Sequence, residues 1–225
     1  MTVASSGRFE RFVDWLDERY DVRLHLLDRV RAARFPSGSP WGYRFGLFAL
    51  LGLAIQFASG LLLLLEYVPT VDGAQPSLRR IVAEIPFGWY VRAVHVLGAS
   101  LAVGSGALYL LSVVLSGLYR RPRELNWVVL TLAFGVLFWM AYTGSVLPWD
   151  ERSLSAASVG HDLAGRTPVV GPRLAPLVLG GAEPTAAPQR RAQAVHLVLG
   201  PALLAILVRV YLSFVRSTGH ERVGE

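Results

Sequence analysis

The sequence predicts an all-α fold, a four-helix transmembrane bundle with an N-terminal amphipathic surface helix, and three observations support this prediction. The chain has 225 residues, 53% of them hydrophobic, and a mean hydropathy of +0.43, which is too apolar for an ordinary soluble domain. Four apolar stretches are long enough to cross roughly 30 Å of hydrocarbon. The 22 basic residues, all of them arginine, flank these stretches as orientation signals do.

Composition also excludes several kinds of chemistry. The chain has no cysteine, which rules out disulfides, thiolate metal sites, iron–sulfur ligation and thioether-attached haem. It has no lysine, so a lysine Schiff base is ruled out as well. The net charge of +6 could indicate a nucleic-acid partner, but the arginines lie beside apolar segments, and we expect no nucleic acid. The N-terminus alternates acidic and basic residues, unlike a cleavable signal peptide.

The first elements are a surface helix and a membrane span. Residues 8–34 place apolar side chains at helical spacing among charges, which predicts an amphipathic helix on the membrane surface within a segment covering 1–43. A partner-binding helix would show the same pattern. Residues 44–67 are expected to form the first span, followed by a proline-containing loop over 68–87.

Three further spans complete the predicted bundle. The second covers about 88–118 and the third about 126–147, which ends because Pro148 cannot continue the helical hydrogen bonds. A Gly/Pro-rich connection runs to about residue 190, and the fourth span covers about 191–216. The transmembrane domain is therefore expected over 44–219, with a tail at 220–225.

The distribution of arginine predicts the orientation of the bundle. The N-terminal segment through Arg44, the turn after the second span and the C-terminal end carry 8, 3 and 3 arginines, or 14, whereas the opposite side carries the other 8. Because arginine favours the cytoplasmic side, we expect both termini there, with the chain integral to a bacterial cytoplasmic membrane.

Two histidines lie inside predicted spans, His95 in the second and His196 in the fourth. Ionisable side chains at membrane depth are costly and are normally paired or bound to something. These two spans run in the same direction, so both histidines lie roughly 10 Å below the outer surface, at the same level. Such a pair can bind one haem iron from opposite sides. The alternative is that each is a solitary histidine bonded to a backbone carbonyl.

Six strings, in this order, carry a family resemblance: "VDWLDERYDV", "EYVPTV", "GWYVRAVH", "RRPRELNWV", "GSVLPWDE" and "HLVLGP". None is decisive singly, but their order and spacing make the chain similar to cytochrome b of the quinol–cytochrome c and quinol–plastocyanin oxidoreductases. The likeness is greatest to the split form, cytochrome b6, and covers about residues 11–219. It implies the N-terminal, four-helix, haem-binding half of cytochrome b.

The resemblance also implies roles for individual residues. His95 and His196 match the axial ligands of the outer-side haem b, and Arg92 matches the residue that pairs with a haem propionate. Positions matching the lining of that haem or the proline of the fourth span are Gln56, Gly60, Gly144 and Pro201. Residues 147–151 match a short helix that borders the outer quinone site, and the border residues are Val146, Leu147, Pro148, Trp149 and Asp150.

The chain departs from the family where a second, inner haem would bind. The second histidines of spans two and four, 14 and 15 residues after the first, are replaced by Tyr109 and Tyr211. An arginine is replaced by Ser112 and a glycine by Leu130, whereas Gly46 is retained. We expect loss of the inner haem, with a Tyr–Tyr hydrogen bond filling a collapsed site. Ligation by tyrosine is the alternative, but it needs two deprotonated phenols facing each other in lipid.

The predicted function is therefore membrane electron transfer by one bis-histidine haem b in a bc/bf-like quinol-oxidising complex. The resemblance implies these partners: membrane lipid, quinol or quinone, a C-terminal-half cytochrome b (subunit IV-like) protein, a Rieske-type iron–sulfur protein, a c-type cytochrome, and a second copy in a homodimeric assembly. The chain shows no general base or nucleophile of its own, so catalysis is assigned to the assembly. Two alternatives stay open, a haem-b anchor linking another dehydrogenase or reductase to the quinone pool, and a scaffold without haem.

Overall fold

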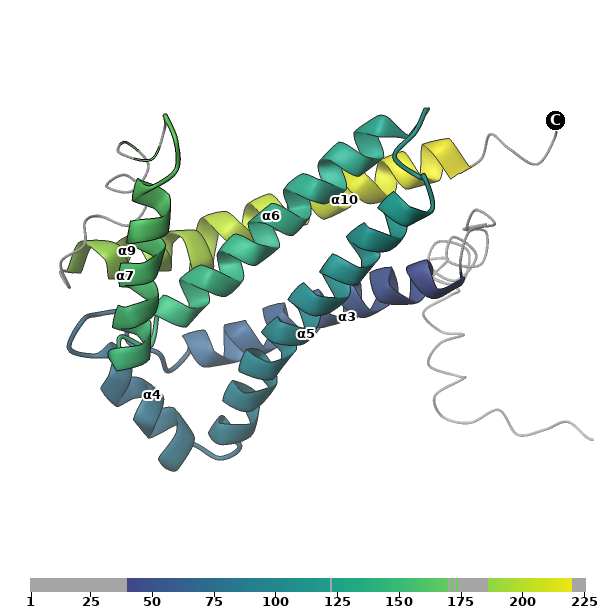
Figure 1. Cartoon of the computed structure of the whole chain (residues 1–225). Helices are drawn as coiled ribbons and strands as arrows, with labels where there is room; N and C mark the ends of the chain where they lie inside the picture. Colours follow the sequence, from purple (N-terminus) through teal and green to yellow (C-terminus); the bar gives the residue numbers. More distant parts are fainter. Residues whose placement is uncertain (1–39, 122, 170, 172, 174–185, 220–225) are drawn as a thin grey trace, which may run out of the picture. The chain divides into compact units, whose positions relative to one another are not determined.

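The described part of the chain contains four long apolar helical segments and no strand (Figure 1). The computed structural model describes residues 40–121, 123–169, 171, 173 and 186–219. The candidate spans are Arg44–Leu64, Gly88–Leu115, Glu124–Val146 and Gln189–Arg216. The predicted all-α class with four transmembrane helices is thereby confirmed. The predicted surface helix, residues 8–34, lies outside the described residues.

The first three spans are uninterrupted helices, α3 (Pro40–Leu64), α5 (Gly88–Leu115) and α6 (Glu124–Val146). α5 ends three residues before the predicted bound because Gly117 adopts a left-handed conformation, with φ of 66°. The Leu118 N–H then donates to the Val113 carbonyl and the Gly117 N–H to the Val114 carbonyl. This pair of bonds is the Schellman arrangement, which glycine permits at little steric cost.

The fourth span is divided into α9 (Ala186–Gln193), a π-helix η2 (Ala194–Leu199) and α10 (Gly200–Gly219). The Gly200 N–H donates to the Val195 carbonyl, five residues earlier, as a π-turn requires. Pro201 follows and has no N–H for the carbonyl four residues before it. The fourth span predicted over about 191–216 therefore contains a π-helix that the sequence did not indicate.

Small residues bring the spans together within residues 38–214, which form one compact unit. α5 packs along α3 and also contacts α6, as the neighbouring ribbons show (Figure 1). A Cβ placed on Gly52 of α3 would lie 3.2 Å from the Ala102 Cβ of α5, so the glycine permits close approach. The buried core here consists of Ala102, Ala133, Leu137 and Leu204, contributed by α5, α6 and α10.

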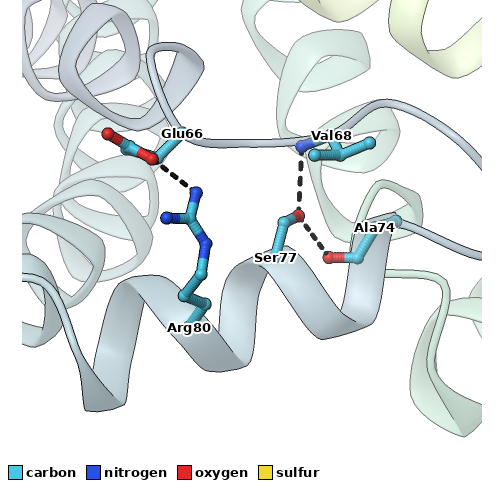
Figure 2. Close-up of polar contacts among 5 residues, drawn as sticks. All are labelled: Glu66, Val68, Ala74, Ser77 and Arg80. Atoms are coloured by element: carbon cyan, nitrogen blue, oxygen red, sulfur yellow. Dashed lines mark hydrogen bonds and ion pairs between the residues drawn. The ribbon is translucent and has the colours of Figure 1, made fainter.

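The expected loop over 68–87 contains a helix, α4 (Ala74–Ala83), which the prediction missed. Its Ser77 hydroxyl accepts from the Val68 N–H and donates to the Ala74 carbonyl, and Arg80 pairs with Glu66 (Figure 2). Ser77 and Ile81 are buried. α4 is therefore anchored to the chain that leaves α3.

The connection after the third span contains a helix, α7 (Glu151–Gly165), which begins at the last residue of the short helix that the resemblance implied over 147–151 and runs well beyond it. Asp150 caps it, because its carboxylate accepts from the Ser153 backbone N–H at 2.9 Å and from the Ser153 hydroxyl at 2.8 Å. Trp149, directly before the cap, has φ of 55°. This tight joint redirects the chain from α6 into α7.

Candidate functional site

The two intramembrane histidines face each other across the bundle, His95 from α5 and His196 from η2. Their ring centroids lie 6.2 Å apart and their planes are inclined by 78°. Imidazole nitrogen–metal bonds are about 2 Å long, so two rings on opposite sides of one metal have centres roughly 6 Å apart. The pair brought together by the fold therefore has the spacing that a shared metal requires.

Each histidine has one ring nitrogen engaged by its surroundings. His196 Nδ1 lies 2.8 Å from the Met140 carbonyl, which can only accept, so Nδ1 carries the proton. His95 Nδ1 lies 3.0 Å from the Ser59 hydroxyl, which itself donates to the Ile55 carbonyl at 2.7 Å. These partners assign the proton to Nδ1 in both rings and leave Nε2 with its lone pair, the state of a metal-binding histidine. His196 can therefore donate to the Met140 carbonyl through Nδ1 and bind a metal through Nε2 at the same time.

Glycines opposite each ring make this arrangement possible. A Cβ on Gly60 would lie 3.2 Å from His95 Cε1, and one on Gly144 would lie 2.6 Å from His196 Cε1. Gly104 of α5 and Gly135 of α6 have nothing within 4 Å of such a Cβ. Gly60 and Gly144 therefore differ from these two glycines, because a side chain at either would press on a histidine ring.

Of the other residues expected at this site, Gln56 contacts a histidine directly. The Gln56 amide donates to the His95 carbonyl at 2.8 Å and so fixes the backbone of α5. Arg92 is half-buried, one helical turn before His95, and Pro201 directly follows η2 and Gly200. Thr143 adds a weaker contact, with its hydroxyl 3.4 Å from His196 Nδ1.

Tyr109 and Tyr211 form a second facing pair on the same helices. Their hydroxyl oxygens lie 2.5 Å apart and their ring centroids 6.3 Å apart, inclined by 81°. The expected Tyr–Tyr hydrogen bond is present. Two ligands on opposite sides of one metal need about 4 Å between donor atoms, so these oxygens contact each other too closely to share one. A Cβ on Gly46 would lie 3.0 Å from the Tyr109 ring.

Ser112 and Leu130, the other two residues of the expected inner site (Tyr109, Tyr211, Ser112 and Leu130, here called the tyrosine half), take no part in the Tyr109–Tyr211 hydrogen bond. The Ser112 hydroxyl donates to the Tyr109 carbonyl at 2.7 Å, within α5. Leu130 is half-buried on α6. Neither residue offers a charged group at this level.

The five residues expected to border a quinone site divide into two sets. Val146 and Leu147 are buried against Ala192 of α9 and pack inside the protein. Pro148, Trp149 and Asp150 are half-exposed in the joint before α7. Burial alone would raise the pKa of Asp150, but hydrogen bonds from Ser153 and the neighbouring Arg152 outweigh it and hold that pKa below its ordinary value. The carboxylate is therefore ionised at neutral pH.

Sequence reasoning missed three polar residues near this joint, Tyr67, Gln189 and Gln193. The Tyr67 hydroxyl donates to the Leu147 carbonyl at 2.8 Å, and Gln193 donates to the Pro69 carbonyl at 2.8 Å. One signal was visible, because Gln189, Gln193 and His196 follow the i, i+4, i+7 spacing of one helix face.

Comparison with known proteins gives consistent matches over nearly the whole chain. A family model described as cytochrome b/b6/petB matches residues 33–219. Menaquinol:cytochrome c reductase cytochrome b subunits of Geobacillus thermodenitrificans and Bacillus subtilis (strain 168) are each 34% identical, over 93% of this chain and 96% of the relative. Cytochrome b6 of Cyanidium caldarium is 31% identical, over 93% and 97%.

A solved structure shows the same likeness in three dimensions. A chain of a structure described as hyperthermophilic respiratory complex III superposes with a TM-score of 0.79 at 31% identity. The match covers 95% of this chain and 58% of the other, so the present chain spans somewhat more than half of that protein's length.

Proposed function

This chain belongs to the cytochrome b/b6 family, and we propose that it is the membrane electron-transfer subunit of a bc- or bf-type quinol-oxidising complex, carrying one haem b between His95 and His196. The observation that carries the proposal is the histidine pair, whose centroids lie 6.2 Å apart with Nδ1 of each ring hydrogen-bonded and Nε2 left for iron. The names of the relatives, menaquinol:cytochrome c reductase cytochrome b subunit and cytochrome b6, favour this function over an anchor for another enzyme.

The residues around the histidines have separate tasks in this proposal. Ser59 and the Met140 carbonyl hold the two rings in one orientation, and Gly60 and Gly144 leave room for them. Haem b, when bound, supplies one-electron transfer to and from quinol. Arg92 pairs with a propionate through its guanidinium fork. Gln56 and Pro201 keep the helix backbones in place on either side.

We further propose that the tyrosine half holds no second haem. The support is the direct contact between the hydroxyls of Tyr109 and Tyr211, together with Ser112 and Leu130 in place of a cation and a glycine. The Tyr109 ring occupies the space beside Gly46. The chain then provides one redox level in the membrane instead of two.

The assembly follows from the same family assignment. The joint from Val146 to Asp150 borders a quinol site, completed by a subunit IV-like protein and a Rieske-type iron–sulfur protein, with a c-type cytochrome as acceptor. We propose a homodimeric complex in the cytoplasmic membrane, with the histidine pair toward the outer surface and both termini cytoplasmic, on the basis of the arginine distribution.

The number of haems per chain tests this proposal most directly. The complex is purified through a tag on this chain, its haem is quantified as the pyridine haemochrome, and co-purifying subunits are identified by mass spectrometry. We expect one b-type haem per chain and a Rieske-type protein. Two haems per chain would contradict the assignment of the tyrosine half, no haem would contradict the histidine site, and a molybdenum-containing partner would favour the anchor.

A further inference from the structure

Tyr67, Gln189 and Gln193 form a polar cluster, here called the polar clasp, where three segments of the chain meet. The Tyr67 hydroxyl donates to the Leu147 carbonyl at the end of α6, and the side chains of both glutamines hydrogen-bond the same phenol. The Gln189 amide also donates to the Thr70 carbonyl at 3.2 Å, and that of Gln193 to the Pro69 carbonyl at 2.8 Å. The clasp thus joins the turn after α3, the end of α6 and α9.

The phenol in the clasp uses its full hydrogen-bonding capacity. A tyrosine hydroxyl has one proton to donate and two lone pairs, and Tyr67 has one acceptor and two donors around it. Burial raises the pKa of Tyr67 to about 12, an increase that the hydrogen bonds from the two glutamines partly oppose. The hydroxyl therefore keeps its proton throughout the physiological range and remains a donor to Leu147.

The clasp lies directly beside the segment that carries His196. Gln189 and Gln193 precede His196 by 7 and 3 residues, and η2 begins at the residue after Gln193. Gln189 is only 1% exposed, so its amide cannot exchange these partners for water. Leu147, which accepts from Tyr67, opens the joint that leads to Trp149 and Asp150.

We propose that the polar clasp is a positioning device that sets the rotation of the fourth span where it enters the π-helix, and thereby the placement of the His196 ring. Tyr67, Gln189 and Gln193 are positioning residues, since they do not touch the ring. A π-helix is an irregular element that the surrounding structure must hold in place. Gly200 and Pro201 follow η2, and the clasp precedes it. The inference rests on the proposed function only where it concerns bound haem.

Two variants remove the clasp in different ways, and a third serves as the control. Tyr67→Phe removes the hydroxyl, and Gln193→Met removes the amide with little change in volume. Tyr90→Phe removes the hydroxyl of a tyrosine that is 55% exposed and lies on α5, five residues before His95. In each purified complex, hydrogen–deuterium exchange is measured over residues 186–199, and the haem midpoint potential is measured by redox titration.

We expect amides of 190–199 to exchange at least tenfold faster in Tyr67→Phe and Gln193→Met than in wild type and Tyr90→Phe. We also expect the midpoint potential to shift in both variants at unchanged haem content, because ligand placement tunes the iron. The double variant should differ little from Tyr67→Phe, since both changes remove one network.

If both clasp variants showed wild-type amide exchange and a wild-type midpoint potential, the proposal would be overturned. If exchange were faster but the midpoint potential were unchanged, the clasp would not position His196. Should Tyr67→Phe fail to assemble, Gln193→Met decides by the same criteria. A wild-type complex without haem contradicts the proposed function instead, and the exchange measurement still decides whether the clasp holds this end of the span.

Discussion

The histidine pair and the tyrosine pair repeat one geometry at two levels of the same helices. The centroids are 6.2 Å apart at 78° in the first and 6.3 Å apart at 81° in the second. In each, the ring from α5 lies against a glycine of α3, Gly60 beside His95 and Gly46 beside Tyr109. The scaffold alone therefore does not determine what each level can bind.

The two levels differ in where the polar atoms of the rings are directed. The histidines use Nδ1 for Ser59 and the Met140 carbonyl, which leaves Nε2 for a ligand. The hydroxyls of the two tyrosines hydrogen-bond each other, with their oxygens 2.5 Å apart. The ring of His196 also faces Gly144 of α6, whereas the α6 residue 14 positions earlier is Leu130. Under the proposed function, a few side chains thus decide whether a level of this scaffold binds a haem.

Removing either histidine should have the largest effect. We expect His95→Ala or His196→Ala to abolish haem binding and to reduce accumulation of the complex, because it removes a ligand and leaves a cavity that costs ~2–5 kcal/mol. Reduced-minus-oxidised spectra of membranes and an immunoblot measure both effects. His161→Ala, a change on α7, should leave the spectrum intact. A normal b-type spectrum in either variant would show that the histidine pair is not the haem site.

Adding a methyl group at Gly144 should disturb the histidine level next most strongly. In Gly144→Ala the new Cβ would lie 2.6 Å from His196 Cε1, so the ring must move, at a cost of about 1–3 kcal/mol for overpacking. We expect lower haem content per chain in the purified complex. Gly135→Ala, on the same helix with nothing within 4 Å, is the matched control and should behave as wild type. Equal haem content in both variants would show that Gly144 is not needed for clearance.

Breaking the tyrosine hydrogen bond should cost stability but no haem. Tyr109→Phe removes one hydroxyl of the pair, which we expect to destabilise the protein by about 1–2 kcal/mol while the haem content stays at the wild-type value. The thermal midpoint of the purified complex and a pyridine haemochrome assay measure the two quantities. Tyr119→Phe, near the end of α5, provides the comparison for an exposed hydroxyl. Loss of a haem in Tyr109→Phe would favour ligation by tyrosine.

The smallest effect is expected at the cap of α7, beside the histidine level. Asp150→Ala should destabilise α7 by about 1 kcal/mol, and Asp150→Asn by less, since an amide oxygen still accepts from Ser153. Because the folded-state pKa lies below the ordinary value, the charged carboxylate stabilises above that value, and this stabilisation is lost as pH falls through the folded pKa. The difference in thermal unfolding between Asp150→Ala and wild type should therefore be full at pH 7 and should shrink progressively as the pH falls below about 4 towards the folded pKa. A difference that stays constant with pH would show that the negative charge of Asp150 does not contribute to the cap.

Some features could be predicted from the sequence because they depend on local composition or on level along a span. Apolar length predicted the four spans, and the match of Tyr109 and Tyr211 to the family's second histidines predicted their hydrogen bond. α7 had a visible start signal, Asp150 followed by an acidic residue, but the glycines and prolines of that connection favoured a loop.

Other features depend on tertiary contacts that no local pattern reveals. Tyr67 meets glutamines more than a hundred residues away, so only the spacing of Gln189, Gln193 and His196 hinted at the clasp. The π-helix is compatible with Gly200 and Pro201 but is not dictated by them. The roles of Arg92 with a propionate and of the joint before α7 with quinol remain predictions.

The π-helix η2 also accounts for the unequal spacing of the paired rings along the second and fourth spans. Tyr109 follows His95 by 14 residues, whereas Tyr211 follows His196 by 15, and yet both pairs meet. In straight α-helices one additional residue would displace the second ring by about 1.5 Å and rotate it by about 100°. The wider turns of η2 take up that residue next to His196. An insertion or deletion of one residue in this span is thus best accommodated within 194–199, where the helix already departs from regular α-helical turns.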